Sequence, residues 1–122
     1  MEIVPREHLN MCRIKEEMEE IGVSNSGIEI MASKFLFNIF KIKDLDIKAA
    51  NILKQDMLSL GGEAAVCRGA ADFTAEKTDV LLGGTLKHYI KLLQKLESQP
   101  FGLNEVCDKL KKFIDFEKNS GG

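Results

Sequence analysis

The chain opens with apolar residues at the spacing of one helix face. Between residues 6 and 21 they recur every three or four positions, with charged residues on the opposite side, which predicts an amphipathic helix. Pro5 suits its first turn and Gly22 its end. The next segment, 27–34, fits either a helical turn or a strand. The apolar positions of the predicted helix are Met11, Ile14, Met18 and Ile21.

Aromatic and β-branched residues dominate the segment 35–42, FLFNIFKI, which predicts a strand. Both of its alternating faces are mostly apolar, as expected for a strand covered by layers on both sides. A helix over 47–60 is predicted to follow, capped by Asp46 and ended by Gly61 and Gly62. Its predicted buried stripe is Ala50, Leu53, Met57 and Leu60.

The second half of the chain predicts two short strands and two helices. The strands cover 64–68 and 79–82 and are joined by a loop. One helix runs from about residue 85 to Glu97, and Asn104 caps the last one. Their predicted inward residues are Leu86, Tyr89, Ile90, Leu93 and Leu96, then Val106, Cys107, Leu110, Phe113 and Ile114.

The order of these elements predicts the architecture. A strand, a helix and a strand in succession indicate a parallel pair with a right-handed crossover. We therefore expect an α/β fold, with a small, mostly parallel sheet of three or four strands sandwiched by about four helices. Residues 1–117 are expected to form a single domain, and residues 118–122 a flexible tail.

Composition narrows the functional classes. The 122 residues are 44% hydrophobic and 30% charged with a net charge of -2, which is typical of a globular domain and favours neither nucleic acid nor an anionic membrane as partner. No apolar run approaches the roughly 20 residues of a membrane span, and no signal peptide is evident. Three cysteines without a Cys-x-x-Cys pair predict free thiols and a cytoplasmic location.

The sequence predicts neither a metal nor a cofactor. The two histidines, His8 and His88, do not stand at ligand spacing from each other or from a cysteine. A surface of mixed charge predicts a monomer or a weak homodimer.

The first candidate site is the segment DVLLGGT at 79–85. Glycines between a strand and a helix leave backbone amides free for an anion, so Gly83, Gly84 and Thr85 are candidate binding residues. The segment lacks the Gly-Lys-Ser/Thr of a phosphate-binding loop and the three-glycine dinucleotide fingerprint. A tight turn is the more ordinary interpretation of two such glycines.

The second candidate is a polar stripe on the helix over 47–60. Lys54 and Gln55 share this stripe with Lys48 and Asn51, because residues three and four apart lie on one helix face. The stripe could bind a phosphate or a carboxylate. The ordinary interpretation is the solvated side of an amphipathic helix.

The third candidate is the pair Cys67 and Arg68 at a predicted strand end. A neighbouring cation can lower a thiol pKa, but a buried, inert thiol is the more common case. In open parallel sheets ligands bind beyond the carboxyl ends of the strands, which would bring Arg68 and Gly84 together at a weak anion site. Asp44 and Asp46, expected at the same edge, would repel an anion.

Four blocks of sequence resemble a known family. AANILKQDMLSLGGEAAVCR (49–68), TDVLLGGT (78–85), QPFGL (99–103) and GIEIMASK (27–34) are similar to the N-terminal extension of a subgroup of dihydropteroate synthases. The resemblance covers most of the chain from residue 21 to residue 103. It implies an accessory domain linked to pterin metabolism, in folate or methanopterin synthesis.

The catalytic part of that family cannot be carried over. A TIM barrel needs about 250 residues, and the pterin-site sequence Asn-x-Thr-Pro-Asp-Ser-Phe is absent, since the only prolines are Pro5 and Pro100. The resemblance thus implies a non-catalytic accessory or interaction domain, either part of a larger synthase or encoded alone. Its implied partner is a dihydropteroate synthase barrel or another protein, and synthase activity would require a separate barrel. The alternative is an anion-binding domain or enzyme that uses the glycine turn.

Overall fold

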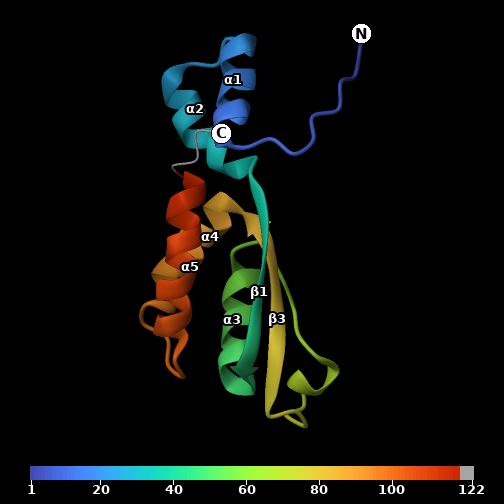
Figure 1. Cartoon of the computed structure of the whole chain (residues 1–122), viewed down its shortest axis with the longest axis vertical. Helices are drawn as coiled ribbons and strands as arrows, with labels where there is room; N and C mark the ends of the chain where they lie inside the picture. The colour runs from blue at the N-terminus through green and yellow to red at the C-terminus, as the bar shows by residue number, and fades with distance from the viewer. Residues whose placement is uncertain (119–122) are drawn as a thin grey trace.

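The computed structural model describes residues 1–118 and contains a three-stranded sheet. Helices lie along this sheet (Figure 1). In chain order the elements are α1 (Met11–Ile21), α2 (Asn25–Met31), the 3-10 turn η1 (Ala32–Lys34), β1 (Phe37–Asp46), α3 (Ile47–Ser59), β2 (Glu63–Ala65), the 3-10 turn η2 (Arg68–Ala70), β3 (Lys77–Thr85), α4 (Leu86–Leu96) and α5 (Leu103–Lys118).

The sheet is antiparallel, so the predicted mostly parallel sheet is wrong. Its strand order is β1-β3-β2, and both outer strands pair antiparallel with β3. The strands β1 and β2, joined by α3, do run in the same direction. They are not neighbours, because β3 lies between them and pairs with each.

Within residues 1–118, helices cover one face of this sheet and leave the other open. Burial alternates along β3, where Thr78, Val80 and Leu82 are buried while Lys77 and Leu81 are exposed. Strand β1 alternates in the same way up to its irregularity after Ile42. Two covering layers were predicted from apolar residues on both faces of β1, and that prediction is wrong. The fold is a two-layer α/β arrangement with one open sheet face.

The core lies between the sheet and helices α3, α4 and α5, and a smaller group from α1 and α2 joins it at one end. The largest completely enclosed side chain is that of Tyr89. Phe113, predicted to point inward, is 59% exposed. The principal core residues are Ala50, Leu53, Met57, Val80, Leu82, Leu86, Leu92, Leu96, Leu103, Cys107 and Ile114.

Caps explain most helix boundaries. Asn10, whose side chain accepts the Arg13 N–H at 2.9 Å, begins α1 five residues later than Pro5 had suggested. Gly22 ends α1 with a φ of 94°, a backbone conformation that glycine adopts without a Cβ clash. The segment 27–34 lies in α2 and η1 and is therefore helical. Lys118 is the last residue of α5, and the rest of the predicted tail lies outside the described residues.

Candidate functional site

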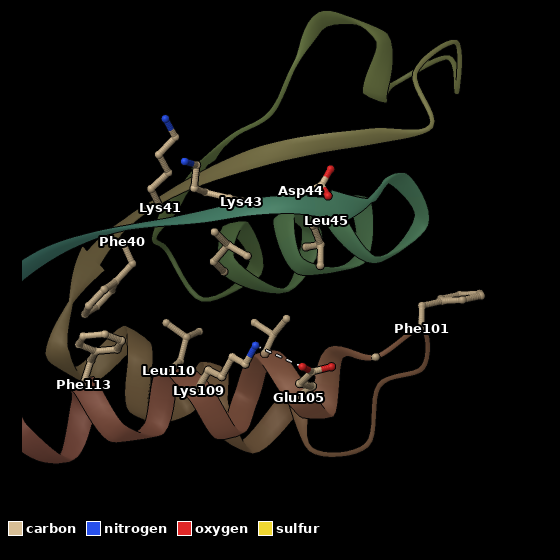
Figure 2. Close-up of a pocket in the computed structure, with 13 residues that line it drawn as sticks. Phe40, Lys41, Lys43, Asp44, Leu45, Phe101, Glu105, Lys109, Leu110 and Phe113 are labelled. Carbon is tan, nitrogen blue, oxygen red and sulfur yellow. Dashed lines mark ion pairs between the residues drawn. The ribbon is translucent and has the colours of Figure 1, made fainter.

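A groove runs between strand β1 and helix α5. It has a volume of about 470 Å³, and Figure 2 shows its two walls facing each other, with Phe40 opposite Phe113. Its apolar side chains are Phe40, Ile42, Leu45, Phe101, Val106, Leu110 and Phe113. Its charged lining residues are Lys41, Lys43, Asp44, Glu105 and Lys109, of which Lys41 and Lys43 point their side chains away from α5 (Figure 2).

Aromatic contacts close one end of the groove. The Phe40 ring meets Tyr89 edge to face, with ring centroids 5.1 Å apart, and meets Phe113 at 5.6 Å. These three residues come from β1, α4 and α5, so ring packing joins the three elements. The ring of Phe113 is held on one side only, which leaves it mostly exposed.

The charges at the groove rim largely pair with one another or with neighbouring strands. Lys109 lies 3.2 Å from Glu105 one turn earlier on α5, and Lys41 lies 3.9 Å from Asp79 on β3. Such exposed pairs contribute little stability, about 0–1 kcal/mol each. The rim therefore carries no strong excess of one sign, which suits an apolar or polypeptide occupant better than an anion.

The outer edge of β1 forms the upper wall of the groove. The Leu36 carbonyl accepts a hydrogen bond from the Leu86 N–H at 2.7 Å. In this register the backbone N–H and C=O groups of the even-numbered residues of β1 point toward β3. Because an antiparallel ladder alternates, Phe37, Ile39 and Lys41 direct their N–H and C=O groups to the free edge. This edge is an unpaired hydrogen-bonding template among the described residues.

A bulge limits the length of this template. The register shifts between Ile42 and Leu45, and Asp44 sits at a φ of 59° with its N–H donated to the Asp79 carboxylate at 2.8 Å. The left-handed conformation at Asp44 bends the strand and interrupts its regular edge. Regular pairing is thus available only from Phe37 to Ile42.

The structure separates the two halves of the predicted anion site. Gly83 pairs with Glu63 at the start of β2, whereas Arg68 follows the end of β2, where the Cys67 N–H donates to Thr78 Oγ1 at 3.0 Å. Since β2 and β3 are antiparallel, their carboxyl ends lie at opposite ends of the sheet. The shared edge that was to unite Arg68 with Gly84 does not exist.

Gly83, Gly84 and Thr85 are the last residues of β3, not a turn. Thr85 caps α4: its N–H donates to His88 Nδ1 at 3.0 Å, and its Oγ1 accepts the His88 N–H at 3.4 Å. The Leu86 N–H donates a hydrogen bond to the Leu36 carbonyl. The amides that were to bind an anion are therefore largely engaged within the protein.

Packing explains Gly84 without a ligand. A Cβ at Gly84 would come within 2.7 Å of Met57 Cε, and one at Gly62 would meet the same methyl at 2.7 Å. Met57 is completely buried. The two glycines thus let α3 lie close against the sheet, with the Met57 side chain against their backbone.

The polar stripe on α3 has structural partners. Asn51 donates from Nδ2 to the Ala70 carbonyl at 2.9 Å and so holds η2 against the helix. The Lys48 ammonium lies 5.7 Å from the centre of the Phe101 ring. Lys54 is half-buried and Gln55 is exposed. The stripe and the groove are separate, because none of the four stripe residues lines the groove, although Phe101, which lies near Lys48, does.

The three cysteine thiols differ in their exposure to solvent. Cys67 is exposed, so its prediction as a buried thiol is wrong. Cys107 is buried, and burial raises its pKa. The Glu16 side chain, which accepts from Cys12 Sγ at 3.5 Å, raises the pKa of Cys12. Both shifts make the neutral thiol more stable and the nucleophilic thiolate scarcer.

One lysine cluster was missed by sequence reasoning. Lys34 at the end of η1 lies beside Lys87 on α4, and Lys91 follows one turn later. The charge of Lys34, partial desolvation and then the charge of Lys91 lower the pKa of Lys87. Within residues 1–118, no acidic side chain lies within the 4.0 Å of an ion pair from these three lysines. The spacing of Lys87 and Lys91 alone could have suggested part of this cluster.

The open sheet face was also missed. It exposes large apolar side chains, with Phe37 60%, Ile39 63% and Leu81 47% accessible. The signal was present in FLFNIFKI, whose apolar residues on both faces were assigned to two covering layers. Such exposed apolar patches are typical of interaction surfaces.

Within residues 1–118, no group of three or more His, Cys, Asp or Glu side chains is arranged to hold a metal ion. Among the same residues, every helix is too short or too polar to span a lipid bilayer.

The chain resembles a region of proteins that contain dihydropteroate synthase. It is 31% identical to the bifunctional dihydropteroate synthase/dihydropteroate reductase of Helicobacter pylori over 90% of its own length, which is 29% of that protein. It is 25% identical, over 98% of its length, to a probable bifunctional folylpolyglutamate synthase/dihydropteroate synthase of Haloferax volcanii. The corresponding protein of Halobacterium salinarum is 28% identical over 84% of the chain.

The chain spans only 12–29% of the length of these relatives. No family model matches the sequence, and no solved structure matches it. The predicted resemblance to a part of such synthases is confirmed.

Proposed function

We propose that this chain is a non-catalytic interaction domain of the folate pathway that docks onto a dihydropteroate synthase. The observation that carries the proposal is the 31% identity over 90% of the chain to a segment of a dihydropteroate synthase/reductase. In such relatives the similar segment shares a polypeptide with the activities in their names. A domain held beside a synthase in this way has a natural docking partner in it.

The open face of the sheet is the proposed docking surface. Phe37 and Ile39 on β1 and Leu81 on β3 expose apolar side chains there, and Gly83 keeps that part of the face flat. Burying these side chains against another domain is favourable by about 25 cal/mol per Å² of apolar surface. The surrounding Lys41 and Asp79 form an ion pair at 3.9 Å, a polar rim suited to the edge of an interface.

A catalytic role for the isolated chain has little support. Its groove is lined by apolar residues and paired surface charges, and condensation of two substrates needs a site that positions both of them. We therefore expect dihydropteroate synthase activity only where a separate barrel is present. The cytoplasm is the compartment we propose, because three free thiols persist there.

The test is binding of the 122-residue chain to dihydropteroate synthase from the same organism, by titration calorimetry. We expect Leu81→Lys to weaken binding at least tenfold, because it places a charge in the centre of the docking surface. Phe73→Lys, a matched change at an exposed aromatic residue in the loop after η2, should leave binding unchanged. Absence of binding by the unmodified chain, or equal loss in both variants, would refute the proposal.

The pathway is tested separately. The chain is paired in turn with a synthase of folate synthesis and with one of methanopterin synthesis. Selective binding to the folate enzyme supports the proposal, and selective binding to the other assigns the chain to methanopterin synthesis. Condensation of a pterin pyrophosphate with aminobenzoate by the purified chain would contradict the non-catalytic role.

A further inference from the structure

We infer that two copies of this chain pair antiparallel along β1, so that each fills the other's groove beside α5 and the two sheets become one sheet of six strands. The first support is the free edge. Phe37, Ile39 and Lys41 present backbone donors and acceptors that no described strand uses. A second β1 satisfies these groups with the same geometry that β3 provides on the other side.

The side chains of this edge are self-complementary. On the open face, β1 is apolar in its first part, with Phe37 and Ile39, and basic in its second, with Lys41 and Lys43. Antiparallel pairing with Ile39 opposite its own copy places each Lys41 opposite the other Phe37. A lysine stem covering an aromatic ring, with its ammonium near the ring face, is a favourable contact.

Charge repulsion selects this register over the neighbouring one. With Ile39 at the two-fold axis, the two Lys41 residues lie four residues apart along the strands, about 13 Å at the usual rise. That exceeds the Debye length of about 8–10 Å, so their repulsion is largely screened. Shifting the axis to Phe40 halves the separation and brings the two lysines within range of each other.

The bulge fixes the extent of pairing. Asp44, at a φ of 59°, bends the strand after Ile42, so edge pairing stops there and does not continue into an open-ended array. An isologous pair along β1 closes on itself. The remaining sheet edge, β2, has only three residues, which is too short for a competing contact.

Helix α5 supplies the second layer of the interface. Phe113, which lines the groove (Figure 2), is 59% exposed, and Phe116, one turn later on α5, is 70% exposed. In the pair, α5 of each copy lies under the edge where the two β1 strands meet. The groove side of Phe40 and Phe113 is then covered by the partner's side chains.

Sedimentation equilibrium of the 122-residue chain at micromolar concentrations tests the inference. We expect a dimer, and at least a tenfold weaker dimer in Ile39→Lys, which places two charges at the two-fold axis. Leu81→Lys is the matched control: it adds the same charge to the same open face but on the central strand, and should leave the dimer intact. Since Leu81→Lys is expected to weaken the proposed synthase docking but not the dimer, failure of one proposal is distinguishable from failure of the other.

A cross-linking measurement fixes the register. The variant Ile39→Cys is made in a background with Cys12→Ser and Cys67→Ser and treated with a mild chemical oxidant. It should form an intermolecular disulfide, because directly opposed, hydrogen-bonded residues of antiparallel strands have Cα atoms about 5.5 Å apart, within disulfide range. Leu81→Cys in the same background should remain reduced. A monomer at all concentrations overturns the inference, as does a dimer that Leu81→Lys disrupts as strongly as Ile39→Lys. A monomer whose β1 binds an extended synthase peptide would instead assign the edge to that peptide.

Discussion

The Tyr89 hydroxyl donates a 2.8 Å hydrogen bond to the backbone oxygen of Asn38, fastening α4 to β1 beneath the sheet. Tyr89 is completely enclosed, and desolvation raises the pKa of its hydroxyl above the ordinary value of 10.0. The phenol is thus an internal donor that is more stable in its neutral form in the folded protein.

This burial predicts alkaline instability. Because the folded-state pKa of Tyr89 is raised, its contribution to the free energy of unfolding is complete below pH 10 and is lost progressively as the pH rises above that value. Tyr89→Phe should lower stability at neutral pH by about 1 kcal/mol through loss of the hydrogen bond. The variant should also be less sensitive to alkali. Urea unfolding between neutral and alkaline pH measures both effects, and equal alkaline loss in the two proteins would contradict the assignment.

Gly84 should be intolerant of a side chain. Gly84→Ala places a methyl 2.7 Å from Met57 Cε in a filled core, and we expect a loss of about 1–3 kcal/mol from overpacking. Gly83→Ala is the neighbouring control, because its Cβ would meet only the exposed Phe37 ring tip at 3.2 Å, which can move. Denaturant midpoints of the two variants provide the comparison. Equal tolerance at both positions would show that Met57 is not packed as described.

The lysine cluster predicts a stabilising substitution. Charged Lys87 is disfavoured by Lys34 and Lys91, so its pKa is lowered and stability should rise as the pH increases through the folded-state pKa. Lys87→Gln should raise the unfolding midpoint at neutral pH and reduce its dependence on salt. Lys109→Gln, at a lysine paired with Glu105, is the control and should not raise the midpoint. An unchanged salt dependence in Lys87→Gln would count against repulsion within the cluster.

The exposed thiol should react first. A disulfide reagent at mildly alkaline pH is expected to label Cys67 before Cys12 and Cys107, because Cys67 is accessible and the other two have raised pKa values. Peptide mapping after brief exposure identifies the modified residue. Labelling that begins at Cys107 would require the packing of α5 to open.

Anion binding at Arg68 remains a prediction. If Arg68 binds an anion, it does so without the glycines, which lie at the other end of the sheet. Phosphate titration followed by nuclear magnetic resonance should then shift signals near Arg68 and leave Gly84 unchanged. Arg68→Ala should remove that response while keeping the fold. Simultaneous shifts at both positions from a single ligand would argue against the antiparallel arrangement.

The sequence predicted the bounds of α3 well because the signals for this helix are local. The spacing of Leu53 and Met57, the cap at Asp46 and the left-handed Gly61 place α3 within one residue of its observed bounds. Apolar periodicity and capping act within a few residues of the chain, so they can be read without knowledge of the fold. The resemblance of 49–68 to dihydropteroate synthases could likewise be read from the sequence.

The order of the strands in the sheet and the distances between candidate site residues depend on the tertiary structure. The insertion of β3 between β1 and β2 depends on pairings between residues such as Phe37 and Thr85, 48 positions apart, which no local pattern encodes. That strand order made the sheet antiparallel and separated Arg68 from Gly84. The face of Ile39 is open because the helices pack against the opposite face. Side-chain alternation fixes which residues share a face of a strand, but the strand's neighbours and the covering of each face depend on the packing of the whole chain.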